Sequence, residues 1–209
     1  MALEISLRSG PAGDSGKMTN SLLGLPRELR DEIFSYVIVK PRSTVITMPS
    51  NYDCFKSEVS ACQPALAGVN HQIRNEVLPA FYGFNTFLAE ISEREDLATA
   101  TRWLNTIGDD NVRSLRRLAL CGWTRVPFGH MISQRWVKVV LDLKEGTLEL
   151  EPSNTGEMTQ HPHIEASVEG LRESFRRLSA EQAGRQAAGF DAASAARLMT
   201  GFHGLCRAV

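Results

Sequence analysis

The sequence has few cysteines, no long apolar run and almost no net charge. Its 209 residues include four cysteines without any Cys-X-X-Cys spacing, so neither a disulfide framework nor a cysteine zinc site is predicted. No apolar stretch approaches the ~20 residues that a membrane-spanning helix needs. The formal net charge of −1 gives no overall attraction to nucleic acid or to an anionic membrane, so neither partner is expected.

Motifs for catalysis and for phosphate binding are also missing. Neither GxxxxGK(S/T) nor GxGxxG occurs. His71 and His130 have no recognisable nucleophile partner in the sequence. His161, His163 and Glu165 form an H-x-H-x-E cluster that would suit a metal on one face of a strand, but their polar surroundings favour a solvated linker. We therefore predict no catalytic residue, no metal site and no cofactor.

The first twenty residues are predicted to be a disordered tail. Glu4 and Arg8 interrupt the short apolar part, so this stretch does not have the pattern of a secretory signal. Its glycine, serine, aspartate and lysine content is typical of disorder. Without a signal peptide the thiols are expected to stay reduced, which predicts a cytoplasmic and/or nuclear protein.

A capped amphipathic helix is predicted within residues 22–37. Pro26 suits the first helical position, and Glu28 follows near the positive end of the helix dipole. From periodicity alone, packing into the core is the commoner role for its apolar stripe, and binding of a partner is the alternative. Both roles can hold if Leu29 and Ile33 face inward while Leu25, Pro26 and Tyr36 stay near the rim. The stripe consists of Leu25, Leu29, Ile33, Tyr36 and Val37.

Further elements follow at regular intervals. A second helix should open at Pro64 and be ended or kinked by Pro79, with a strand over residues 85–91. Ser92 and Glu95 have the spacing of a capping box for a third helix, which Gly108 should end. The second helix is expected to place four residues on one face: Leu66, Val69, Ile73 and Val77.

The second half of the chain predicts strands and then helices. Residues 115–120 should form a buried strand, which makes residues 85–120 a strand–helix–strand unit of the parallel crossover type. The single L-x-x-L-x-L match there is too short for a leucine-rich repeat. Alternating residues at 136–143 and 147–151, on both sides of Gly146, predict a hairpin, and a polar linker at 152–163 precedes an amphipathic helix. Beyond Ser179 we expect at most one helix, around residues 192–199, with a thin apolar stripe.

Basic and aromatic residues are not predicted to bind nucleic acid. Arg113, Arg116 and Arg117 follow Asp109 and Asp110, so a salt-bridged surface is the expected arrangement. The three tryptophans are more often core or interface anchors than stacking platforms, because no basic stripe lies between them.

The pattern LP-x-EL-x-x-x-I-x-x-YV at residues 25–37, followed by VN-x-QIR-x-E-x-LP-x-FYG-x-NTF at 69–87, resembles the short F-box-like proteins of filamentous fungi. The resemblance covers roughly residues 22–120. It implies an adaptor whose N-terminal helices dock on a Skp-type subunit of a cullin ubiquitin ligase while the remainder holds a target protein. The partner-binding residues that it implies are Leu25, Pro26, Leu29, Ile33 and Tyr36.

The expected fold is mixed α/β, and two rival functions accompany the adaptor. F-box-like helices and an α/β core should occupy residues 21–151, with a small sheet of four or five strands, and helices should occupy 164–209. One rival is a structural or interaction protein without cullin recruitment, which the interval 40–63 between the two motif blocks favours. The other is an enzyme of unrecognised type, whose signature would be a pocket joining His71, His130 or His161 to a carboxylate.

Overall fold

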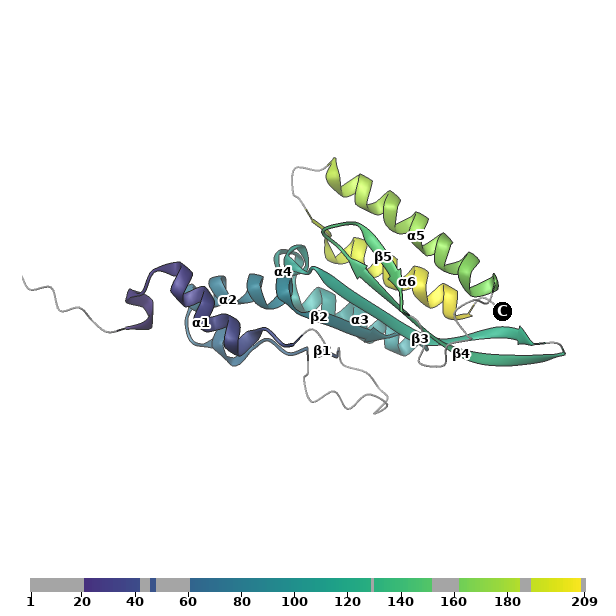
Figure 1. The fold of residues 1–209 in the computed structure, drawn as a ribbon, viewed down its shortest axis with the longest axis horizontal. Coiled ribbons are helices and arrows are strands. Elements are labelled where there is room, and N and C mark those ends of the chain that lie inside the picture. The colour runs from purple at the N-terminus through teal and green to yellow at the C-terminus, as the bar shows by residue number, and fades with distance from the viewer. Residues whose placement is uncertain are drawn as a thin grey trace, which may run out of the picture.

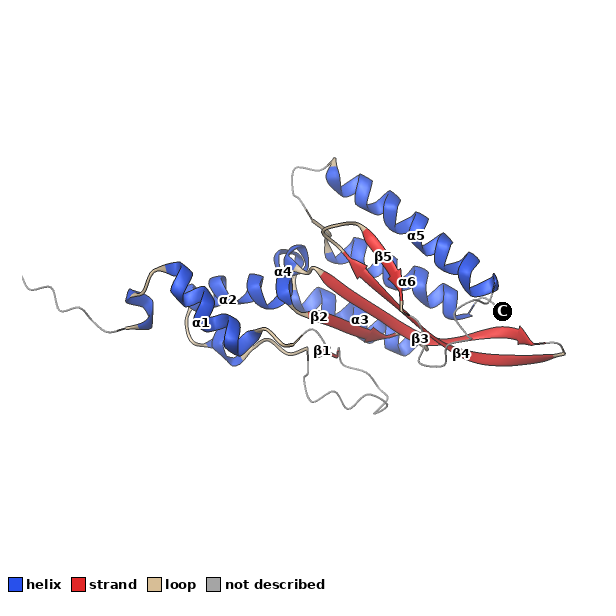
Figure 2. Cartoon of the chain, viewed as in Figure 1, coloured by secondary structure: helices blue, strands red, loops and turns tan. Residues whose placement is uncertain are grey.

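The computed structural model describes residues 21–41, 46–47, 61–128, 130–151, 162–184 and 189–207. These residues form a mixed α/β fold, as predicted, with an elongated shape (Figures 1 and 2). The helices are η1 (Leu22–Gly24), α1 (Arg27–Ile38), η2 (Ala65–Gly68), α2 (His71–Phe84), α3 (Arg94–Ile107), α4 (Asp109–Ser114), α5 (Pro162–Ala183) and α6 (Ala192–Arg207). The strands are β1 (Ile46–Thr47), β2 (Thr86–Glu90), β3 (Arg117–Phe128), β4 (Met131–Asp142) and β5 (Thr147–Leu150).

The five strands form one sheet in the order β1-β2-β3-β4-β5. β1 and β3 both pair with β2 in parallel, whereas β4 is antiparallel to β3 and to β5. α3 and α4 connect β2 to β3, which confirms the predicted parallel strand–helix–strand unit. The predicted β4–β5 hairpin is also confirmed, and Gly146 in its turn has a φ of 67°, a conformation that glycine adopts without strain.

β3 and β4 are longer than the predicted strands, and the hairpin that they form with each other was not predicted. Its register runs from the Arg117–Asp142 pair to the Phe128–Met131 pair, whereas we expected only residues 115–120 and 136–143 to be extended. β2 borders β3 only as far as Cys121, and β5 borders β4 only from Val139 onward. The far half of the hairpin therefore continues beyond the sheet as a two-stranded ribbon, at the opposite end of the molecule from α1 and α2 (Figure 1).

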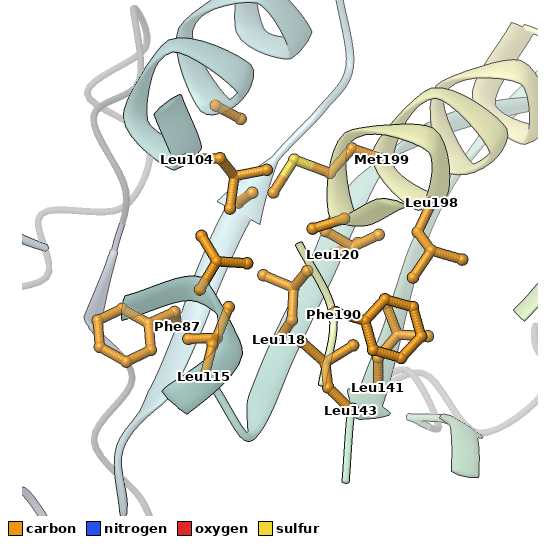
Figure 3. Close-up of a cluster of buried hydrophobic side chains, with 14 of the residues drawn as sticks. Phe87, Leu104, Leu115, Leu118, Leu120, Leu141, Leu143, Phe190, Leu198 and Met199 are labelled. Atoms are coloured by element: carbon orange, nitrogen blue, oxygen red, sulfur yellow. The ribbon is translucent and has the colours of Figure 1, made fainter. Parts of the chain in front are cut away.

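The main core lies between the sheet and helices α3, α5 and α6. Leu118, Leu120 and Leu141 point from the strands toward Leu198 and Met199 of α6 (Figure 3). The predicted apolar face of α5 is confirmed, because its five members are all buried. They are Ile164, Val168, Leu171, Phe175 and Leu178.

The expectation of a short, thinly apolar last helix is wrong. α6 extends to Arg207 and contributes eight buried residues. Its alanines and glycines permit close packing: a Cβ added at Gly201 would lie 3.2 Å from Leu171 of α5. On the sheet side, a Cβ at Gly122 of β3 would lie 3.0 Å from the Cys206 sulfur of α6. The composition that suggested weak order instead lets this helix approach its neighbours closely.

The boundaries of the second helix differ from the prediction. Asn70 caps α2, because its side chain accepts a hydrogen bond from the Ile73 N–H at 2.8 Å, and the turn before it is a separate 3-10 helix. Val69 is consequently exposed and does not share the buried face. α2 also continues past Pro79 and Gly83. An internal proline costs a helix ~3 kcal/mol, and burial of Leu78, Phe81 and Tyr82 around it offsets this cost.

The capping box of α3 lies one residue later than predicted. Glu93 and Asp96 form it, while the Ser92 hydroxyl accepts a hydrogen bond from the Trp123 N–H at 3.2 Å. The predicted end of α3 at Gly108 is confirmed, with a φ of 80°. The predicted tail at 1–20 and the linker before Pro162 lie outside the described residues, and α5 begins at Pro162 itself.

Candidate protein-interaction surface

α1 packs with a different side from the one that periodicity indicated. Its buried residues are Arg30, Phe34 and Ile38, and Phe34 is only 2% exposed. Every member of the predicted stripe is exposed, and the most exposed is Tyr36 at 81%. The expectation that this stripe packs into the core, and that Leu29 and Ile33 face inward, is therefore wrong. We call the exposed set Leu25, Pro26, Leu29, Ile33, Tyr36 and Val37 the α1 face.

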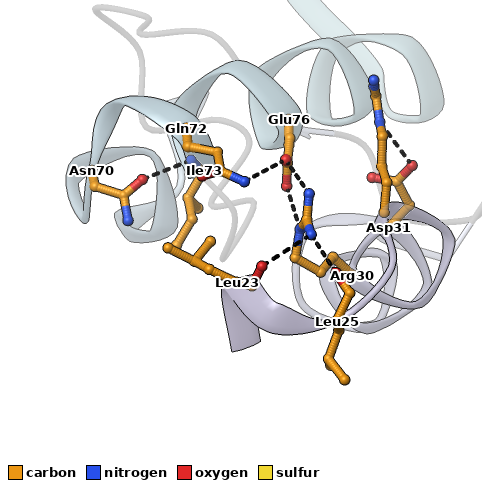
Figure 4. Close-up of polar contacts among 9 residues, drawn as sticks. Leu23, Leu25, Arg30, Asp31, Asn70, Gln72, Ile73 and Glu76 are labelled. Carbon is orange, nitrogen blue, oxygen red and sulfur yellow. Dashed lines mark hydrogen bonds and ion pairs between the residues drawn. The ribbon is translucent and has the colours of Figure 1, made fainter. Parts of the chain in front are cut away.

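A paired arginine explains why the helix is oriented in this way. Arg30 reaches across to α2, where its Nε and Nη2 donate to the two carboxylate oxygens of Glu76 at 2.9 and 2.5 Å (Figure 4). Its Nη1 donates to the backbone carbonyl of Leu25. Both charged side chains are almost fully covered, and a covered charge is tolerated only when it is paired and hydrogen-bonded. Leu25 points away from Glu76 and toward solvent (Figure 4).

The electrostatics of this pair follow from its geometry. The Arg30 hydrogen bonds lower the pKa of the Glu76 carboxyl below its ordinary value, against the opposing effect of burial. The same bonds raise the pKa of Arg30. Both groups therefore stay charged near neutral pH, which keeps α1 bound to α2.

Asn85 joins the other ends of the same two helices. This buried amide donates to the carbonyls of Ile38 at 2.9 Å and Phe81 at 2.8 Å, in the last turns of α1 and α2. Its side-chain oxygen accepts from the Lys40 N–H at 2.8 Å. One side chain thus forms hydrogen bonds with three backbone groups at two helix ends, which fixes the C-terminal end of α1 against that of α2.

The α1 face is the largest concentration of exposed apolar side chains among the described residues. Seven of the twelve large apolar side chains that are exposed lie between Leu22 and Val37. Glu28 and Glu32 lie on the remaining exposed side of α1 and form no ion pair with any residue that the structure describes, while Arg27 pairs with Asp31 at 3.5 Å. An apolar surface of this kind with a polar border is typical of a protein-interaction site.

The basic patch and the histidine cluster considered in the sequence analysis do not form a binding site of this kind. The predicted salt-bridged surface is confirmed for Arg113, which pairs with Asp110 at 2.7 Å, whereas Arg116 pairs at 2.9 Å with Asp142 of β4, a partner that was not predicted. Among the described residues, no group of three His, Cys, Asp or Glu side chains is placed to hold a metal ion. His161 and the side chain of His163 lie outside the described residues.

Two cavities bear on the enzyme hypothesis. One, of about 520 Å³, lies at the β4–β5 turn, and the other, of about 510 Å³, lies beside the first turns of α5. Within the described part of the chain, neither is lined by a histidine or a cysteine. His71 is exposed and contacts Asn75 of its own helix. Cys206 is buried, and burial raises the pKa of its thiol to about 12, which keeps it protonated and unreactive.

The residues that hold the α1 face in place were not identified from the sequence. Arg30 is separated from Glu76 by 46 positions and Asn85 from Ile38 by 47, so no local spacing relates them. A signal was present in α1, where Arg30, Phe34 and Ile38 recur every four residues beside the longer apolar stripe. A charged residue spaced four positions from an apolar residue, and on the same side of a helix as two of them, can indicate a buried ion pair.

Comparison of the chain with profiles of known protein families, with curated protein sequences and with solved structures finds no match. In the part of the chain that the structure describes, no helix is both long enough and apolar enough to span a bilayer.

Proposed function

We propose that this chain is a non-catalytic protein-interaction module that recruits a target protein to a Skp-type subunit of a cullin ubiquitin ligase. The α1 face would dock on that subunit, and the α/β part would hold the target. Ubiquitin transfer would be carried out by other subunits, so the chain needs no cofactor of its own. It would act in the cytoplasm and/or the nucleus.

The observation that carries the proposal is the exposure of the α1 face. Burial of a Leu, Ile or Val side chain contributes about 1.5–3 kcal/mol to stability, so a folded chain gains by covering such residues. Here the helix instead buries an arginine beside Phe34 and Ile38 and leaves the longer apolar stripe in solvent. A partner that covers this stripe would recover that free energy as affinity.

The residues behind the α1 face support the same proposal. In the second motif block, Asn70 caps α2, Glu76 pairs with Arg30, and Asn85 joins the ends of α1 and α2. These polar positions hold α1 with one side outward and do not themselves contribute to the exposed apolar surface. A docking helix fixed in this way is preorganised, which reduces the entropy lost when a partner binds.

A second candidate function is an interaction protein that uses this fold without cullin recruitment. One observation favours it: the chain between α1 and α2 supplies β1, which pairs with β2 at the edge of the sheet. The two helices are therefore not consecutive in the fold, unlike those of an uninterrupted F-box. This candidate retains the α1 face as a binding surface but assigns it a different partner.

Co-purification with a Skp-type adaptor distinguishes the two candidates. The tagged chain is compared with the double variant Ile33→Ser/Tyr36→Ala, which changes only exposed side chains. Two controls keep the α1 face intact: Glu28→Gln on the acidic side of α1, and Met131→Ala, an exposed apolar residue at the far end of the molecule. Circular dichroism establishes that all four proteins are folded.

The expected result is a stoichiometric complex for the wild type and both controls, and its loss in the double variant. If the folded wild type forms no complex, cullin recruitment is wrong and the interaction protein of the second candidate remains. If the double variant binds as well as the wild type, the α1 face is not the docking surface.

A further inference from the structure

The far half of the β3–β4 hairpin carries a second concentration of exposed apolar side chains. We define the hairpin arm as residues 122–128 of β3 and 131–137 of β4, which extend beyond the neighbouring strands (Figure 1). Trp123, Met131 and Ile132 are exposed on it. One side of the arm packs on the core, because Thr124, Val126 and Val137 are buried and the Thr124 hydroxyl donates to the Leu205 carbonyl of α6 at 3.1 Å. The exposed apolar groups on the rest of the arm favour a covering partner.

One face of the arm brings Trp123 and Ile132 together with a cation, whereas Met131, the cross-strand partner of Phe128, belongs to the opposite face. Residues that are paired across an antiparallel ladder share a face, so Trp123, Arg125 and Pro127 lie on the same side as Trp136, Gln134 and Ile132, their cross-strand partners. The two tryptophan rings meet edge to face, with centroids 5.1 Å apart. The Arg125 side chain is exposed, and no acidic residue in the described part of the chain pairs with it.

The arm contains no acidic residue at all. Between Gly122 and Leu141 the sequence has no aspartate or glutamate, although it carries Arg125, Arg135 and Lys138. Lys138 lies at the base of the arm and pairs with Glu151 at 2.6 Å. Arg135 is the cross-strand partner of Thr124 and belongs to the other face, so Arg125 is the cation that makes the Trp123 side of the arm complementary to an acidic ligand.

We propose that this face of the hairpin arm binds an extended acidic peptide segment of the target protein, in which acidic and apolar side chains alternate. Apolar side chains of the peptide would lie on Trp123 and Ile132, and an acidic side chain would pair with Arg125. The inference rests on the proposed function in one respect: it takes the hairpin arm to be the part of the adaptor that binds the target protein. The α1 face, at the opposite end of the molecule, is not involved (Figure 1).

Recognition uses the face of the arm and not the edge of β3. The Trp123 N–H already donates to Ser92, and alternate residues of a strand direct their backbone groups to the same side. Pro127 lies on that side and has no N–H to donate. A ligand strand would therefore find few donors along this edge, and the proline also protects it from pairing with other chains.

Charge and side-chain chemistry favour the peptide over two other occupants. A second copy of the chain would place two positively charged, acid-free arms against each other, and like charges in contact are destabilising. Single-stranded nucleic acid needs several cations along its backbone and stacked aromatic faces. This face has one arginine, Arg125, its tryptophans meet edge to face, and Ile132 on it is aliphatic.

Fluorescence anisotropy with the isolated full chain tests the proposal. The probe is a fluorescein-labelled peptide of alternating glutamate and phenylalanine, compared with a lysine–phenylalanine peptide and with single-stranded oligothymidine. Arg125→Glu has a matched control in Arg102→Glu, which reverses an exposed arginine of α3 and changes the net charge equally. Ile132→Ser, at a residue that is 61% exposed, is matched by Val69→Ser, at 62%.

The acidic peptide should bind in preference to both other probes. Arg125→Glu should weaken it by about tenfold, a difference of ~1.4 kcal/mol, while Arg102→Glu has little effect. Ile132→Ser should weaken binding more than Val69→Ser does. Equal binding of the acidic and basic peptides, preference for oligothymidine, or equal effects of the two arginine reversals would each overturn the proposal. Adaptor co-purification with Arg125→Glu is a separate measurement, so failure of docking and failure of peptide binding are distinguished.

Discussion

Two aromatic residues two positions apart in α1 should respond very differently to truncation. Phe34 is 2% exposed and contacts the core, so Phe34→Ala should remove about 3–5 kcal/mol from the free energy of unfolding. Tyr36 is 81% exposed, and Tyr36→Ala should change that free energy by no more than about 0.5 kcal/mol. The two variants should thus differ by roughly 3 kcal/mol, which exceeds a hundredfold in the folding equilibrium.

Urea unfolding measures this difference directly. With a slope of ~1–3 kcal/mol per molar urea, the two midpoints should differ by about 1 M or more. Circular dichroism and tryptophan fluorescence should give coincident curves, which establishes two-state behaviour. If Tyr36→Ala destabilises the protein as much as Phe34→Ala does, the orientation of α1 is wrong and the α1 face is part of the core.

Three further predictions concern the packing around this helix and the sheet. Asn85→Ala should lower the free energy of unfolding by about 3 kcal/mol in a urea titration, because one buried N–H and two carbonyls lose their partner. Gly122→Ala should destabilise by ~1–3 kcal/mol, since its Cβ would lie 2.8 Å from the Ile91 carbonyl, whereas Gly170→Ala, with open space around it, should stabilise α5 by ~0.5–1 kcal/mol. The pKa of Glu76 is lowered in the folded state, so its contribution to stability is complete above the pKa of an unfolded glutamate, ~4.3, and is lost as the pH falls through the folded value. The protection of the α1 amides from hydrogen exchange, taken relative to the intrinsic exchange rate at each pH, should therefore fall on acidification, and Glu76→Gln should remove that pH dependence.

Local signals in the sequence were sufficient for several elements. Gly108 and Gly146 occupy positions of positive φ that a chain rarely adopts with other residues, so the helix end and the hairpin turn were predictable from composition and spacing. α5 has a single apolar stripe, and a helix with one such stripe has only one way to pack.

Elements with two competing local signals could not be resolved in this way. α1 is apolar on two sides, and the outcome depends on Glu76 and Asn85, which come from distant parts of the chain. α6 intersperses its large buried side chains, such as Leu198 and Phe202, with alanines and glycines, and the close approach of Leu171 to Gly201 requires such small residues. In both cases the packing is decided by a contact with a residue far away in the sequence, and it cannot be predicted until the position of that residue in the fold is known.

The distant partners of α1 also determine when this helix can become stable during synthesis. Arg30 cannot form its ion pair until Glu76 has been synthesised, 46 residues later. The end of α1 likewise lacks its hydrogen-bond partner until Asn85 is added, 47 residues after Ile38. A helix of 12 residues is marginal in water without tertiary contacts. While the ribosome adds the intervening chain, both apolar sides of α1 are therefore uncovered, one awaiting α2 and the other awaiting a partner molecule. Exposed apolar surface makes an incompletely folded chain prone to aggregate, so we expect the yield of folded protein to depend on chaperones that cover α1 during this interval.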